Sequence, residues 1–154
     1  MTIRPYKAAD KNSLVVIFKL NTPKYFDPNE VNDFEAYLEQ HNDTYLTIEL
    51  NDKIVGGTGY YINDTDHSGR ITWIFFHPDF AGQGLGKKTV EHCLTILKSN
   101  PEVEKLVVTT SQLAYKFFEK FGYVLVQTKK DYWGKGLDLY LMEQPNRPPS
   151  TPYR

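Results

Sequence analysis

The sequence predicts one α/β domain built on a mixed sheet, and three observations support this prediction. Its 154 residues suit a single domain that buries roughly two-thirds of the surface exposed by the unfolded chain. Apolar residues recur at helical spacing at Leu14, Ile17 and Phe18 but alternate with polar ones over 45–50, so the hydrophobic period changes from helix to strand. Helical and extended segments then follow one another along the chain, which indicates helices packed against a sheet.

The N-terminal part of the chain is expected to form a strand and two helices. An extended segment at 3–6 precedes a helix that begins near Asp10. A second helix is predicted with Asp27 as its N-cap, Pro28 at the first helical position and Glu30 at the third. This order is close to a capping box, in which the acidic side chain accepts the N–H of the cap residue.

A β-hairpin is predicted next, with strands at 45–50 and 53–62 joined by a turn at Asn51-Asp52. A strand at 70–76 is apolar on both faces, which places it at the centre of the sheet. Glycine inside a strand indicates a bulge or the close approach of another part of the chain. The second hairpin strand holds three such residues, Gly56, Gly57 and Gly59.

The C-terminal half is expected to alternate between helices and strands. The expected elements are a helix over about 84–99, a strand at 105–109, a helix over 111–121 capped by Ser111, and strands at 123–130 and 137–143 joined by a loop at 131–136. The segment 145–154 has four prolines in ten residues and is expected to be disordered. The domain is therefore predicted to span residues 1–144.

Composition excludes several classes of protein. The chain carries 19 acidic and 18 basic residues, a net charge of -1, without a block of like charges that would favour nucleic acid or an anionic membrane. No apolar run approaches the roughly 20 residues that span a bilayer. The single Cys93 and the absence of a signal-peptide pattern at the start favour a reducing cytoplasm. His41, His67 and His92 have no partners at metal-ligand spacing, so no metal site is expected.

A glycine-rich turn follows the central strand. The strand stops at His77-Pro78, because proline cannot donate to a strand ladder. A helix bearing Lys87 and Lys88 comes after the turn, and the free N–H groups and dipole of a helix start attract anions. The glycines alone would equally suit a tight strand-to-helix connection. The turn reads Gly82-Gln83-Gly84-Leu85-Gly86-Lys87.

Two other phosphate-binding patterns do not fit this turn. A P-loop would need glycine where Ala81 stands and a hydroxyl residue where Lys88 stands. A dinucleotide fingerprint would need glycine where Lys87 stands, and it would follow the first strand of its unit. The turn therefore belongs to neither class.

The stretch Phe76 to Lys87 resembles the hallmark of the GCN5-related N-acetyltransferase (GNAT) family, an apolar-x-Pro step, a Gln/Arg-x-x-Gly-x-Gly/Ala turn and a helix. A second family block appears as Phe117-Phe118-Glu119-Lys120-Phe121-Gly122-Tyr123. The order of elements also agrees, so the resemblance covers Met1 to about Gln144. It implies an acyl-CoA N-acyltransferase fold, with a mostly antiparallel sheet, splayed central strands and about four helices, and acetyl-CoA as co-substrate.

The resemblance also implies which residues hold the cofactor. The pantetheine arm would enter between the splayed strands, and the glycine turn would take the pyrophosphate. A helix from Ser111 would flank the thioester. The implied contacts are Ile74, Phe75 and Phe76 for the arm, Gly82, Gln83, Gly84, Leu85, Gly86 and Lys87 for the pyrophosphate, and Ser111, Tyr115 and Phe118 beside the thioester.

Three positions depart from the family pattern. Ala81 stands for the usual Gln or Arg, Ser111 for an Asn, and Phe118 for the tyrosine thought to protonate the departing thiolate. Tyr115 would share a helix face with Ser111 and Phe118, so it is a candidate acid, although it could equally pack in the core.

An amine acceptor must lose a proton before it attacks the thioester, which calls for a base. Candidates are Glu49 on the hairpin and His77 at the strand end, where a role in fixing the turn is the alternative. In this fold the loops at 21–26 and 132–133 would bound the acceptor pocket with aromatic walls. The resemblance implies direct acetyl transfer to a primary amine of a small molecule or peptide. A non-catalytic acyl-CoA sensor is the alternative, and exposed sheet edges make a homodimer conceivable.

Overall fold

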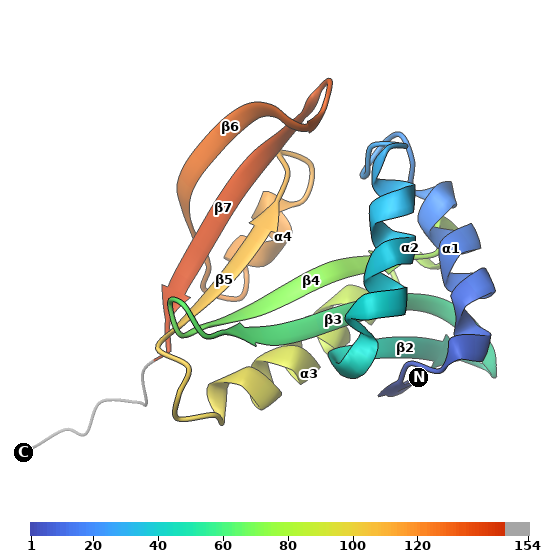
Figure 1. The fold of residues 1–154 in the computed structure, drawn as a ribbon, viewed down its shortest axis with the longest axis horizontal. Coiled ribbons are helices and arrows are strands. Elements are labelled where there is room, and N and C mark those ends of the chain that lie inside the picture. Colours follow the sequence, from blue (N-terminus) through green and yellow to red (C-terminus); the bar gives the residue numbers. More distant parts are fainter. Residues whose placement is uncertain (147–154) are drawn as a thin grey trace, which may run out of the picture.

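The computed structural model of the chain describes residues 1–146, which form one mixed sheet flanked by helices (Figure 1). Within these residues the sheet has seven strands in the order β1-β2-β3-β4-β5-β7-β6. Its neighbouring strands are antiparallel except for the parallel pair β4 and β5. The strands are β1 (Thr2–Pro5), β2 (Tyr45–Leu50), β3 (Lys53–Asn63), β4 (Ser68–Phe76), β5 (Lys105–Thr110), β6 (Val124–Gly134) and β7 (Leu137–Pro145).

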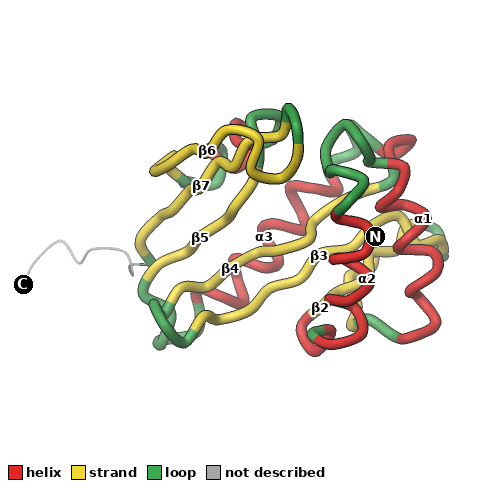
Figure 2. The backbone as a smooth tube through the Cα atoms, turned by 45° about the horizontal axis from the view of Figure 1, so that its top comes forward, coloured by secondary structure: helices red, strands yellow, loops and turns green. Residues whose placement is uncertain are grey.

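Helices cover both faces of the sheet, with α1 and α2 on one face and α3 on the other (Figures 1 and 2). The helices are α1 (Lys11–Leu20), α2 (Glu30–Gln40), α3 (Leu85–Lys98) and α4 (Tyr115–Glu119), with short 3-10 turns at Ala8–Asp10, Asn42–Thr44 and Pro78–Phe80. The predicted fold class is confirmed: the sheet is mixed and mostly antiparallel, four α-helices lie within the described residues, and β4 is its central strand.

Three apolar clusters hold the layers together, and the two largest lie on opposite faces of the sheet. Tyr45 and Leu46 are neighbours in β2 but belong to different clusters, because successive side chains of a strand point to opposite faces. The Tyr45 cluster joins β2 and β4 to α1 and α2 through stacked rings such as Phe18 and Phe34, whose centroids are 4.8 Å apart. The other cluster joins β5 and β7 to α3, where Cys93 is fully buried, as expected for a small apolar residue.

The observed elements differ from the predicted ones mainly at their ends. Helix α2 begins at Glu30, two residues after the predicted start at Pro28. The helix predicted over 111–121 is a single short helix, α4, preceded by a turn. Strand β6 continues to Gly134 through most of the predicted loop.

The folded part also extends beyond its predicted end at Gln144. Pro145 is the last residue of β7, and the Asn146 N–H donates to the Glu104 carbonyl at 3.0 Å. The rest of the segment expected to be disordered, 147–154, lies outside the described residues.

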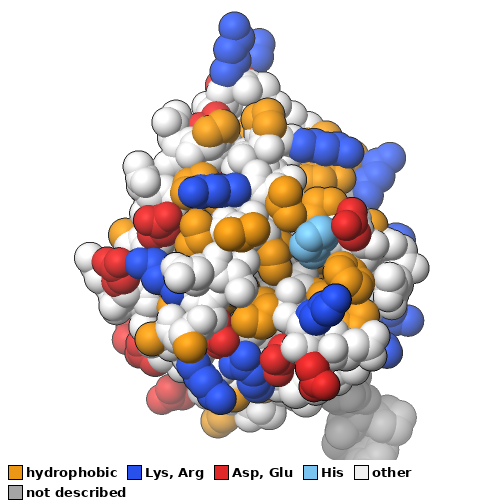
Figure 3. Space-filling view, turned by 90° about the vertical axis from the view of Figure 1, so that its right-hand side faces the viewer, with side chains coloured by type: hydrophobic (Ala, Val, Ile, Leu, Met, Phe, Trp, Pro, Cys, Tyr) orange, Lys and Arg blue, Asp and Glu red, His pale blue; other side chains and the backbone are white. Residues whose placement is uncertain are grey.

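On the side of the molecule where α1 lies, hydrophobic side chains occupy the middle and charged side chains of both signs surround them (Figure 3). That face therefore presents no field of a single sign, in keeping with the net charge of -1. None of the helices in residues 1–146 combines the length and apolar character needed to cross a membrane.

Candidate active site

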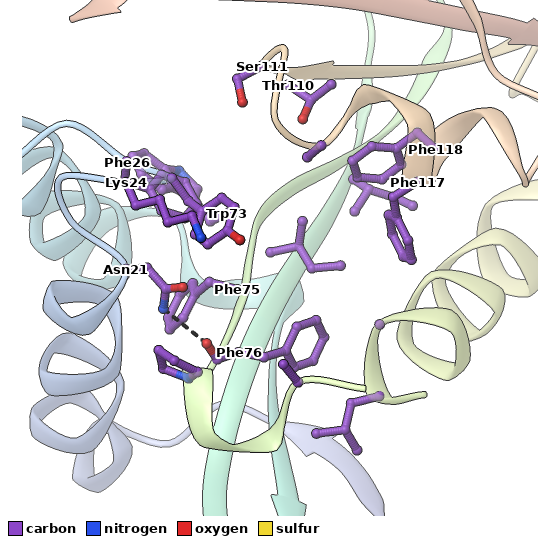
Figure 4. Close-up of a pocket in the computed structure, with 18 of the residues that line it drawn as sticks. Asn21, Lys24, Phe26, Trp73, Phe75, Phe76, Thr110, Ser111, Phe117 and Phe118 are labelled. Carbon is purple, nitrogen blue, oxygen red and sulfur yellow. Dashed lines mark hydrogen bonds between the residues drawn. The ribbon is translucent and has the colours of Figure 1, made fainter. Parts of the chain in front are cut away.

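A cleft of about 880 Å³ opens between β4 and β5 and runs from the glycine turn to the loop that precedes α2 (Figure 4). Its volume lies in the range typical of ligand sites. The cleft exists because β4 and β5 pair only over Ser68–Arg70 and Lys105–Val107 and then diverge. From Ile71 to Phe76, the edge of β4 that faces β5 has no strand partner in the described residues. The splayed strands implied by the family resemblance are therefore present.

A β-bulge in β4 shapes the wall of this cleft. Gly57 pairs with Phe75 but Gly59 pairs with Thr72, so β4 has one residue more than β3 over this interval. Trp73 within the bulge has a φ of 48°, a left-handed conformation that costs roughly 1–2 kcal/mol for such a residue.

Tyr45 holds the bulge from β2, which lies on the far side of β3 from β4. Its hydroxyl donates to the Trp73 carbonyl at 2.8 Å, and burial keeps the pKa of this phenol well above its ordinary value. Tyr45 thus remains a neutral donor. The Tyr45 side chain needs the space left by glycine, since a Cβ on Gly57 would lie 2.5 Å from its hydroxyl and one on Gly59 would lie 3.1 Å from its ring. A Cβ on Gly59 would also lie 2.6 Å from the Tyr37 hydroxyl. These contacts explain Gly57 and Gly59 inside β3.

The glycine turn forms the opposite end of the cleft and the start of α3. Gly84 is the N-cap, with a φ of 76°, which favours glycine. Because the first bond of the helix runs from the Lys88 N–H to the Gly84 carbonyl, the N–H groups of the preceding residues 85–87 have no partner within the helix. No side chain caps them. This helix start is therefore suited to an anionic group.

Most of the residues predicted to hold the cofactor line this cleft, but Gln83 and Tyr115 do not. The Tyr115 ring packs on Tyr140 of β7, with centroids 4.8 Å apart. Tyr115 was placed near the thioester on the assumption of a helix from Ser111, whereas α4 begins only at Tyr115 itself. The lining residues from that predicted set are Ile74, Phe75, Phe76, Gly82, Gly84, Leu85, Gly86, Lys87, Ser111 and Phe118.

Glu49, a candidate base, lies outside the lining of the cleft. Its carboxylate accepts a hydrogen bond from Arg4 Nε at 2.9 Å. Arg4 comes from β1, which pairs with β2, and also binds Asp10 at 2.8 Å. Glu49 therefore belongs to an ion-pair network at the edge of the sheet, and its assignment as the base stays a prediction.

His77, the other candidate base, lines the cleft but one of its ring nitrogens is engaged. Its Nδ1 accepts the Asp79 N–H at 3.1 Å, which fixes the turn after β4. Next to it, the Asn21 side-chain amide donates to the Phe76 carbonyl at 3.0 Å (Figure 4). This contact ties the loop after α1 to the end of β4.

Glu30 is a lining residue that the sequence pattern did not single out as functional. Glu30 is 8% exposed. Its Oε2 accepts a hydrogen bond from the Asp27 N–H at 2.9 Å, which is the reach-back contact of the predicted capping box. Burial raises the pKa of the carboxyl to about 6, and the charges of Asp27 and Asp33 act in the same direction. The capping pattern accounted for Glu30 without indicating that it lines the cleft. Its position just after the loop at 21–26, which was predicted to bound the acceptor pocket, was the available signal.

Aromatic rings enclose the end of the cleft near Glu30. Phe26 stacks near Trp73, with centroids 6.4 Å apart and planes at 22°. Trp133 reaches across from β6 and donates its Nε1–H to the Thr110 carbonyl at 3.0 Å. All three line the cleft, whereas Tyr132, predicted beside Trp133, does not.

Within residues 1–146, no three His, Cys, Asp or Glu side chains gather as a metal ion would require. The arrangement therefore combines a helix start suited to an anion, an open strand edge and an aromatic pocket with one buried carboxylate.

Residues 12–123 match the family described as the acetyltransferase (GNAT) family. The chain is also similar to an acetyltransferase of Pectobacterium atrosepticum, with 26% identity over 133 residues that cover 82% of this chain and 89% of the relative.

Several solved structures share the fold, among them two N-acetyltransferases. One is the ribosomal-protein-S18-alanine N-acetyltransferase from Escherichia coli, with a TM-score of 0.77 at 17% identity over 99% of this chain and 98% of that one. The other is an aminoglycoside 6'-N-acetyltransferase in complex with coenzyme A, with a TM-score of 0.76 at 13% identity over 98% of this chain and 100% of that one.

Proposed function

Because the chain belongs to the acetyltransferase (GNAT) family, we propose that it transfers the acetyl group of acetyl-CoA to a primary amine of a small molecule or peptide. Transfer is direct, within a ternary complex of protein, acetyl-CoA and amine. The observation that carries this proposal is the single continuous cleft, which has an anion site at one end and an aromatic pocket with a carboxylate at the other.

The cofactor end of the cleft suits acetyl-CoA. The pyrophosphate oxygens would accept hydrogen bonds from the free N–H groups of Leu85, Gly86 and Lys87 at the start of α3. The pantetheine arm would bind the unpaired edge of β4 as an added strand does. A coenzyme A complex of a protein with this fold, the aminoglycoside 6'-N-acetyltransferase, supports the same cofactor here.

The acceptor end suits an amine. The names of two proteins of this fold state that they acetylate amine-bearing compounds, an aminoglycoside and spermidine. In the reaction the neutral amine nitrogen attacks the thioester carbon, a C–N bond forms, and the C–S bond breaks with its electron pair on sulfur. The proton lost by the nitrogen ends on the departing thiolate. Thiols have pKa values near 8.5, so this thiolate departs without requiring a strong acid.

Direct transfer is favoured over an acetylated enzyme because Cys93, the one thiol of the chain, is fully buried. Burial raises the pKa of that thiol to about 12, and Cys93 is not among the residues that line the cleft. The same single cysteine is the basis for the expectation that the protein works in the reducing cytoplasm.

Release of the CoA thiol from acetyl-CoA in the presence of an amine panel tests the proposal. Amine-dependent release above the rate without amine is the expected result. Tight CoA binding without turnover for any amine would instead select the non-catalytic acyl-CoA sensor. Preference for ATP or NAD over CoA would contradict both readings.

A further inference from the structure

We infer that Glu30 binds the ammonium group of the acceptor, and that the acceptor is a small monoamine with an aromatic or apolar body. This inference rests on the proposed function, because it assigns the substrate class of the same cleft. Within the described part of the chain, the fold buries the Glu30 carboxylate without placing a cationic side chain in an ion pair with it.

The surroundings of Glu30 show that this carboxylate has no counter-ion. It forms no ion pair within residues 1–146. The neighbouring charges that act on it, Asp27 and Asp33, are both negative. A buried carboxylate is costly unless it is paired, so a bound cation would supply what the chain itself does not.

Glu30 lies at the acceptor end of the cleft. The Asp27 N–H donates to its Oε2, and the Asp27 side chain closes against Gly134, the neighbour of Trp133. Phe26, on the other side of Asp27, stacks near Trp73. The carboxylate and the three aromatic side chains therefore belong to one pocket.

The lining of the cleft also selects the rest of the acceptor. Glu30 is its one acidic residue among those described, whereas Lys24 and Lys87 also line it. A second ammonium group on the acceptor would find no second carboxylate. Phe26, Trp73 and Trp133 offer flat apolar surface instead, which suits an aromatic ring or an alkyl chain and also favours a cation through cation–π contact.

Binding measurements on the protein saturated with CoA test this inference without requiring turnover. Calorimetry would compare 2-phenylethylamine, 2-phenylethanol and spermidine. The wild-type protein is expected to bind 2-phenylethylamine at least about 10-fold more tightly than the alcohol, which lacks the ammonium, and more tightly than spermidine.

Glu30→Gln is expected to remove the preference for the amine over the alcohol and to leave CoA affinity unchanged. Asp33→Asn, which removes one charge from the same helix outside the cleft, is the matched control and should change amine affinity less than about twofold. Unchanged amine affinity in Glu30→Gln would overturn the inference. Equal binding of amine and alcohol by the wild type, tighter binding of spermidine, or no binding of 2-phenylethylamine would do so independently of the variant.

Failure of the proposed function would appear differently. In that case the amine would bind with these preferences while acetyl-CoA released no thiol, and the assignment of Glu30 would stand without catalysis.

Discussion

Replacing Glu30 by Gln should make the protein more stable at neutral and alkaline pH. Burial raises the pKa of this carboxyl from 4.5 to about 6, and each pKa unit corresponds to about 1.4 kcal/mol. The ionised carboxylate therefore destabilises the folded state by about 2 kcal/mol. For a chain of this length such a change shifts the midpoint of thermal unfolding by roughly 6 °C. The Gln side chain keeps an oxygen for the Asp27 N–H, so the capping contact survives.

The pH dependence of this gain follows from the sign of the shift. Since the pKa in the folded state lies above that in the unfolded chain, the penalty is absent below pH 4.5 and complete above about pH 6. Thermal unfolding of wild type and Glu30→Gln at pH 8 should differ by the full amount, and at pH 4 by little. An equal difference at both pH values, or a less stable variant at pH 8, would refute the reasoning. A stabilising substitution that weakens amine binding is the signature of a functional charge.

Three further predictions concern other parts of the cleft. Gly84→Asp should lower acetyl-CoA affinity at least about 10-fold in calorimetry, because it brings a negative charge to the helix start, where no atom lies within 4 Å of the added Cβ. Gly136→Asp should not lower it: Gly136 lies outside the cleft, and its φ of 82° imposes the same backbone strain on Asp as the φ of 76° at Gly84. Unchanged affinity in Gly84→Asp would exclude the turn from the site. Tyr45→Phe should lower the free energy of unfolding in urea by about 1–3 kcal/mol, since the Trp73 carbonyl loses its donor; unaltered stability would mean that this bond does not hold the bulge. Tyr115→Phe should keep turnover within about twofold, as its ring packs outside the cleft, and a drop of 10-fold or more would restore Tyr115 as the acid.

Features encoded by local sequence patterns were predicted well. The hairpin of β2 and β3 follows from alternation and an Asn-Asp turn, and it was found at 45–50 and 53–63. The start of α3 after Gly84 follows from glycine chemistry and from the proline that ends β4. Both depend on residues adjacent in sequence, so no knowledge of tertiary contacts was needed.

Features that depend on distant contacts were missed. Glu49 was proposed as a base because the amine acceptor must lose a proton. Nothing in the sequence indicated that Arg4, 45 residues away, would bind it. Tyr115 was assigned to the cleft from helical spacing, but the chain forms a helix only over Tyr115–Glu119. Glu30 was explained by capping, and that local explanation was correct but incomplete, since the same side chain also faces the cleft.

The most direct test of the account is a crystal structure of the protein with CoA and 2-phenylethylamine. We expect the pyrophosphate on the N–H groups at 85–87, the pantetheine arm between β4 and β5, and the amine nitrogen at about 3 Å from the Glu30 carboxylate. CoA bound away from the glycine turn, or an amine bound outside the aromatic pocket, would contradict the account.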